Sequence, residues 1–194
     1  MSAHIDRAAA VKRGVLVGVV GGALGAAAMA MYAMVVSAAV KDVGFFTPLY
    51  HIASAIIAPK AMMTSMAEAG DGNSAFFTGG PAAVGLVVHM MVGVGAGAVF
   101  GALVGWFRPG RALTVVAGAI YGLLVMVGSA FVGLPIVANL FGGGKAVSEM
   151  ATMVGWGTFT VEHLIFGLVL GVVVGAKAAG PALVASRPVA ARTA

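Results

Sequence analysis

Long apolar stretches alternate with short polar connections along this chain. Four such stretches lie at residues 14–40, 81–107, 112–133 and 150–176, and the first of them carries no charged residue. A helix of about 20 apolar residues crosses the ~30 Å hydrocarbon core of a bilayer. The pattern therefore predicts an all-α membrane protein with four transmembrane helices.

The composition excludes an ordinary soluble domain. Of the 194 residues, 61% are hydrophobic and only 9% are charged, and the mean hydropathy is +1.07. A soluble domain carries roughly a quarter of its residues as charged side chains, so much of this surface must face lipid. The sequence has no cysteine, which excludes disulfides and thiolate metal ligands. The net charge of +5 comes without a basic stripe interleaved with aromatic residues, so nucleic acid is not an expected partner.

Lysine and arginine are unequally distributed between the two ends of the predicted spans. Three of them, Lys41, Lys60 and Lys145, lie in the two longer connections. Eight lie at the termini or between the second and third spans, namely Arg7, Lys12, Arg13, Arg108, Arg111, Lys177, Arg187 and Arg192. Cytoplasmic loops carry the excess of positive charge. We therefore expect a multi-pass protein of a bacterial inner membrane with both termini in the cytoplasm.

The second and fourth stretches resemble each other at an offset of 74 residues. His89 then coincides with His163, and the glycines that follow at four-residue spacing coincide as well: Gly93, Gly97 and Gly101 with Gly167, Gly171 and Gly175. The first and third stretches agree more weakly, with Gly21 and Gly25 aligned to Gly118 and Gly122. The similarity predicts two repeats of two helices, inserted in the same direction and related by a pseudo-twofold axis along the membrane normal.

The chain thus divides into a cytoplasmic segment at 1–13, a first repeat at 14–107, a second repeat at 108–180 and a disordered cytoplasmic tail at 181–194. Each repeat has an outward segment between its two spans. In the first, Thr47 and Pro48 can begin a helix and Pro59 can end it. Such a helix is too short to span, so we expect short interfacial or re-entrant helices on the outward side, with Tyr50 among the headgroup anchors.

The histidines mark the candidate site. Residues four apart share one face of a helix, so His89 and His163 each begin a stripe of glycines. Glycine stripes let membrane helices approach closely, so we expect both imidazoles to face a helix–helix interface and, through the repeat, each other. Glu162 adds an ionisable carboxylate inside an apolar span, where such a group suggests a function by default. His51 can join from the outward segment.

Three interpretations of these residues remain open. They can be hydrogen-bonding groups that only hold helices together, a proton-handling or pH-responsive site, or a haem or metal site. A metal usually has three or four ligands. No cofactor is therefore predicted, and His89 and His163 are the only candidate ligands.

No catalytic motif is recognisable, so we do not expect an enzyme. The preferred function is a small membrane protein with a pH-responsive or proton-handling site between its helices. The alternative is a non-catalytic accessory subunit of a larger membrane complex. The expected partners are the lipid bilayer and either other membrane-protein subunits or further copies of this chain.

Several short motifs are shared with a known family. They are Gly133-Leu134-Pro135 after the third span, Val147-Ser148-Glu149, and His163-Leu164 in the last span. Together with the number of spans, they make the chain similar to the YagU-type family of small bacterial inner-membrane proteins, which are associated with acid resistance. The similarity covers mostly the second half, and the motifs are spaced differently here. It implies a pH-linked role and no defined reaction.

Overall fold

The computed structural model describes residues 2–178, which contain helices and no strand. The predicted tail at 181–194 lies outside this range. The long helices are α1 (Ser2–Ala39), α4 (Gly79–Phe107), α5 (Arg111–Gly128) and α9 (Trp156–Ala178). The shorter elements are α2 (Thr47–Ala53), α3 (Lys60–Gly70), the π-helical turn η1 (Ser129–Gly133), α6 (Leu134–Phe141), α7 (Gly144–Ser148) and α8 (Met150–Val154).

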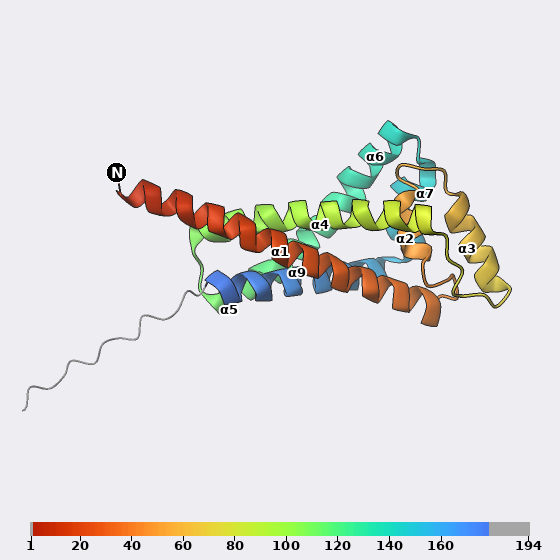
Figure 1. The fold of residues 1–194 in the computed structure, drawn as a ribbon, viewed down its shortest axis with the longest axis horizontal. Coiled ribbons are helices and arrows are strands. Elements are labelled where there is room, and N and C mark those ends of the chain that lie inside the picture. The colour runs from red at the N-terminus through yellow and green to blue at the C-terminus, as the bar shows by residue number, and fades with distance from the viewer. Residues whose placement is uncertain (1, 179–194) are drawn as a thin grey trace, which may run out of the picture.

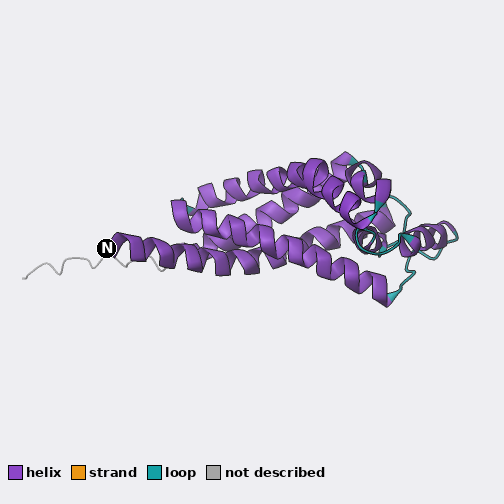
Figure 2. Cartoon of the chain, turned by 90° about the horizontal axis from the view of Figure 1, so that it is seen from above, coloured by secondary structure: helices purple, strands orange, loops and turns teal. Residues whose placement is uncertain are grey.

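The four predicted spans are confirmed as helices that are long and apolar enough to cross a membrane. They cover Arg7–Ala39, Gly79–Phe107, Arg111–Phe141 and Trp156–Lys177. Figures 1 and 2 show them running lengthwise, with the short helices α2, α3, α6 and α7 gathered toward one end. The start of α1, the end of α9 and the α4–α5 connection lie together at the opposite end (Figure 1).

The third span is longer than the sequence predicts. We expected it to end at Gly133, before Pro135, but the helix continues through η1 and α6 to Phe141. Pro135 lies in the first turn of α6, where a proline needs no intrahelical N–H partner. The wider π turn directly before it absorbs the missing hydrogen bond, so the proline redirects the span and does not end it.

The helices pack in the order α4, α1, α9, α5, with α1 and α9 at the centre. The core of the bundle consists of Phe100 and Val104 from α4 and of Phe166, Leu170 and Val174 from α9. The outer helices α4 and α5 hardly touch directly. They are joined by Tyr121, whose hydroxyl donates to the Ala96 carbonyl at 2.8 Å.

Glycine brings the neighbouring helices into backbone contact. A Cβ placed on Gly97 of α4 would lie 2.6 Å from Cα of Gly22 in α1. A Cβ placed on Gly167 of α9 would lie 2.9 Å from Cα of Gly122 in α5. Both distances are below an ordinary Cβ contact, so no other residue fits these positions without separating the helices.

The segment between the first and second spans packs against the bundle. Tyr50 of α2 is only 1% exposed, and its hydroxyl accepts the N–H of Thr78 at 2.9 Å. The prediction that Tyr50 anchors in the headgroup layer is therefore wrong. Its helix lies against α4, where a Cβ on Gly85 would collide with the carbonyl oxygen of Leu49. An interfacial amphipathic helix would keep Tyr50 at the lipid boundary, whereas α2 uses it as core.

Candidate polar centre at the outward end

His89 is held by the first helix. Its Nε2–H donates to the Ala26 carbonyl of α1 at 2.9 Å. A carbonyl can only accept, so the proton of a neutral His89 lies on Nε2. Ala26 is in the α1–α4 contact, since its Cβ would lie 2.5 Å from a Cβ on Gly93. His89 therefore links α4 to α1 one helical turn before the contact at Gly93.

His163 is held by its own helix. Its Nδ1–H donates to the Phe159 carbonyl at 2.8 Å, and its ring lies 4.4 Å from the Phe159 ring between centroids. The side chain is 5% exposed. His163 and His89 are held by different partners, and in the described part of the chain neither a hydrogen bond nor a ring contact joins the two imidazoles.

Glu162 is 6% exposed and lies next to His163 in sequence. Successive helical residues point about 100° apart, so its carboxylate and the imidazole do not face each other. Within residues 2–178 the carboxylate has no hydrogen-bond or salt-bridge partner. The cation that acts on it is Lys41, after the end of α1. The Lys41 Nζ lies 3.4 Å from the position of a Cβ on Gly155, two turns before Glu162.

His51 lies apart from these three residues. Its Nε2–H donates to the Ala146 carbonyl of α7 at 2.6 Å, so it links the outward segments of the two predicted repeats. Burial lowers the pKa of His51 below its ordinary value, although the hydrogen bond to Ala146 acts in the opposite direction. Since the ring belongs to a different contact, we describe the polar centre as His89, Glu162 and His163.

The glycines predicted for packing lie at helix contacts, each facing the partner within its own pair of spans. On α4, a Cβ on Gly93 would lie 3.1 Å from the Gly22 carbonyl oxygen, and one on Gly101 would lie 2.9 Å from Cα of Gly18. On α9, a Cβ on Gly171 would lie 3.0 Å from Cα of Val115, and one on Gly175 would lie 3.2 Å from the Arg111 carbonyl oxygen. The two stripes therefore face α1 and α5, and not each other.

The contacts relate the two pairs of spans in a different register from the sequence alignment. Gly22 lies against the Gly93 carbonyl and Cα of Gly97, and Gly122 lies in the same way against the His163 carbonyl and Cα of Gly167. In the helix contacts, His163 of α9 is therefore equivalent to Gly93 of α4, and His89 lies one helical turn before that position. The histidines coincide in the alignment but occupy non-equivalent positions in the packing.

The weak alignment of the first and third spans is also shifted. Gly21 and Gly25 were aligned with Gly118 and Gly122. A Cβ on Gly21 would meet Leu170, and one on Gly25 would lie 2.8 Å from the Phe166 carbonyl, so both face α9. Gly18 and Gly22 of α1 contact α4 in the same way that Gly118 and Gly122 of α5 contact α9.

Sequence reasoning missed two neighbours of the centre. Lys41 was counted only for orientation, and its proximity to Glu162 depends on how α1 and α9 pack. Trp156 begins α9, with its ring 5.6 Å from that of Phe131 and 6.4 Å from that of Phe159, which contacts His163. Phe159 lies four residues before His163, and Trp156 lies three residues before Phe159. This spacing was a usable sequence signal for the row of rings.

The centre offers few ligands for a metal. No group of three or more His, Asp or Glu side chains that could hold a metal ion occurs in the described part of the chain. The two imidazoles each use one nitrogen on a backbone carbonyl.

Comparisons with known proteins give no relative to guide the interpretation. No family model, curated protein or solved structure matches this chain.

Proposed function

We propose that this chain is a small polytopic membrane protein whose polar centre responds to pH at the outward end. The observation that carries the proposal is the placement of His89 and His163. His163 is buried and His89 is half-buried, and each imidazole commits one N–H to a backbone carbonyl of the bundle. A pH-linked role is also what the resemblance to the YagU-type family implies.

Proton uptake changes what each imidazole requires. A neutral imidazole has one N–H donor, and both nitrogens of the protonated ring are donors. The second nitrogen of His89 and of His163 has no hydrogen-bond partner among residues 2–178. Protonation therefore adds a donor without an acceptor and a charge with little solvation, both of which are costly inside a bundle. Acidification should loosen the contact between α1, α4 and α9.

Glu162 is a further ionisable group beside the two imidazoles. Its carboxylate has Lys41 as the cation that acts on it and no direct hydrogen-bond or salt-bridge partner among the described residues, so acidification can protonate it as well. The response is thus a rearrangement of side chains at the outward end.

The inward halves of the spans do not support proton conduction across the membrane. Between His163 and Lys177 the α9 helix carries no titratable side chain over a rise of about 21 Å. The α4 helix likewise carries none between His89 and Arg108. Between the level of the two histidines and the basic end, Tyr121 of α5 is the single titratable group of the described spans, and its hydroxyl is bonded to a backbone carbonyl. We therefore propose a pH sensor and not a channel.

Trp156 makes the proposal testable by fluorescence. The chain has two tryptophans, so Trp106→Phe leaves Trp156 as the reporter at the outward end, connected to His163 through the Phe159 ring. In vesicles, external acidification from pH 8 to 3 should change its emission in a sigmoidal manner. His163→Gln should remove the change, and His89→Gln should shift its midpoint. An identical titration in all three proteins would reject the sensor.

A proton-flux assay separates sensing from conduction. Vesicles that contain the protein should hold a proton gradient as long as empty vesicles do. If the wild type dissipates the gradient and His89→Ala does not, then the centre conducts protons and the sensor interpretation is wrong.

We further propose that the basic end faces the cytoplasm of a bacterial inner membrane. In the described part of the chain, six cationic residues lie at this end and three at the other. The absence of native cysteine allows single-cysteine labelling. With a membrane-impermeant maleimide on spheroplasts, Asn73→Cys should be labelled and Ala8→Cys should be protected. The reverse pattern would invert the orientation.

A second candidate function is that of an accessory subunit. The third span contacts mainly α9 and presents an exposed apolar face that includes Leu124 and Phe131. Lipid or a membrane-protein partner would cover this face equally well. Gentle detergent extraction followed by native electrophoresis distinguishes them, because a subunit would migrate with its complex and a free monomer would contradict the assignment.

A further inference from the structure

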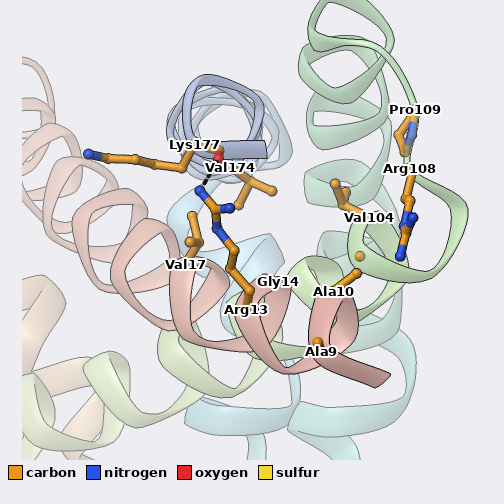
Figure 3. A pocket seen from close by; sticks show the side chains of 11 residues that line it. Ala9, Ala10, Arg13, Gly14, Val17, Val104, Arg108, Pro109, Val174 and Lys177 are labelled. Atoms are coloured by element: carbon orange, nitrogen blue, oxygen red, sulfur yellow. Dashed lines mark hydrogen bonds between the residues drawn. The ribbon is translucent and has the colours of Figure 1, made fainter. Parts of the chain in front are cut away.

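A cavity of about 350 Å³ lies at the basic end of the bundle, opposite the polar centre. It is bounded by α1, α4, α9 and the α4–α5 connection (Figure 3). Of the eleven lining residues that the structure describes, Arg13, Arg108 and Lys177 are cationic and none is acidic. The others are small or apolar. The cavity therefore combines positive charge with an apolar wall.

The cavity lies at the depth expected for lipid headgroups. Trp106 and Phe107, at the end of α4, are 54% and 72% exposed. The Arg7 guanidinium lies 5.0 Å from the centroid of the Trp106 ring. Tryptophan beside a cation is typical of the membrane–water interface, and Arg108 follows two residues later. We therefore infer that the cationic groups lie near the headgroup phosphates of the adjacent leaflet.

Two guanidinium groups carry the charge that faces the cavity. Arg13 donates one N–H to the Lys177 carbonyl at 3.2 Å, which leaves four of its five donors. Arg108 ends α4 in the left-handed conformation at φ 52°, a position that glycine usually occupies. Figure 3 shows Arg13 and Arg108 on opposite sides of the cavity, while the Lys177 side chain leads away from it.

We propose that this cavity binds the phosphate of an anionic phospholipid between Arg13 and Arg108. Guanidinium groups match phosphate oxygens with paired N–H donors, and basic pockets between transmembrane helices are suited to anionic headgroups. The valine wall, formed by Val17, Val104 and Val174, would contact the glycerol and the first methylenes of an acyl chain. A free phosphate would leave this apolar wall uncovered, which is why the occupant is a lipid.

The test uses the full-length protein in detergent and native mass spectrometry. The probes are phosphatidylglycerol, phosphatidylcholine with the same acyl chains, and inorganic phosphate. Arg13→Gln/Arg108→Gln removes the two guanidiniums. Lys12→Gln/Arg111→Gln is the matched control, because it removes two exposed cations from the same end that do not line the cavity.

Wild type and control should retain phosphatidylglycerol with apparent Kd values within about twofold of each other, and the cavity variant should bind at least about tenfold more weakly. Phosphatidylcholine should bind more weakly to all three proteins. Equal weakening in both double variants would mean non-specific attraction to the basic end and would overturn the site. Displacement by inorganic phosphate at concentrations similar to those of the lipid would overturn the choice of a lipid.

The single variants protect the test against a folding failure. If circular dichroism shows that the double variant has lost helix, Arg13→Gln and Arg108→Gln are measured separately. Each should weaken phosphatidylglycerol binding about threefold. Wild-type affinity in both would refute the proposal.

Discussion

Gly97→Ala should destabilise the bundle because α1 and α4 meet backbone to backbone at this position. The added Cβ would lie 2.6 Å from Cα and 2.9 Å from N of Gly22, and it would collide with the Gly18 carbonyl oxygen. An ordinary contact begins near 3.4 Å and the contact with the Gly18 carbonyl oxygen is the tightest of the three, so the helices must separate locally by about 1 Å. A gap of 0.5–1 Å forfeits about a quarter to a half of the dispersion attraction across an interface. We expect a loss of about 1–3 kcal/mol.

Gly95→Ala is the matched control. The two glycines lie on the same helix, but a Cβ on Gly95 has nothing within 4 Å. Both substitutions change helix propensity equally, by up to about 1 kcal/mol in favour of alanine, so the difference between the variants isolates the packing. The free energy of unfolding is measured by reversible denaturation of the purified protein in mixed micelles. Equal stabilities would refute the argument that this glycine sets the distance between α1 and α4.

Three further outcomes are expected. Gly167→Ala should destabilise the α5–α9 contact by about 1–3 kcal/mol in the same assay, because a Cβ on Gly167 meets the α5 backbone. Gly157→Ala should not destabilise it, because a Cβ on Gly157 has nothing within 4 Å. An equal loss of stability in both variants would contradict this packing argument. Tyr121→Phe should cost about 0.6 kcal/mol through the lost hydrogen bond to the Ala96 carbonyl, and an unchanged unfolding free energy would mean that this bond contributes nothing. Burial lowers the pKa of His51, so the folded state favours the neutral ring. Its contribution to stability is therefore complete above an unfolded pKa near 6.5 and is lost as the pH falls toward the lowered pKa. The free energy of unfolding, measured from pH 8 to 5, should depend less on pH in His51→Gln, and parallel profiles would contradict the assignment.

The spans could be predicted from sequence because lipid imposes a simple requirement. Residues 14–40 form an uninterrupted apolar run, and the observed span at Arg7–Ala39 differs mainly at its polar start. Pro135 misled the prediction, since a proline that ends a helix and one that redirects it look alike in sequence. The distinction depends on the π turn at Ser129–Gly133, which no local motif announces.

The polar centre could be predicted only as a set of candidate residues. The intramembrane histidines and Glu162 stand out because ionisable groups are rare in apolar runs. That His89 and His163 face each other was expected from the repeat and stays a prediction. Their partners could not be predicted, because a glycine stripe indicates a close contact without indicating which helix makes it.

The outward segment shows the same limit. In and after α2 the sequence places Leu49 and Ile56 on one side at helical spacing and the polar His51 and Ser54 elsewhere. Leu49 is buried, but Ile56 is 49% exposed, and His51 and Ser54 are buried as well. Where the surroundings are lipid, an apolar side chain gains nothing by turning inward. Polar side chains turn toward acceptors such as the Ala146 carbonyl, which becomes available only after α7 has packed.

The packing order α4, α1, α9, α5 has a consequence for biosynthesis. Spans one and two are adjacent both in sequence and in space, so they can join as a hairpin while the ribosome is still translating. The third span has almost no contact with that hairpin, and its main neighbour α9 is synthesised last. Until α9 inserts, Gly118 and Gly122 of the third span must face lipid. A chain truncated before Trp156 would thus leave the third span in the bilayer without its main packing partner and accessible to quality-control proteases.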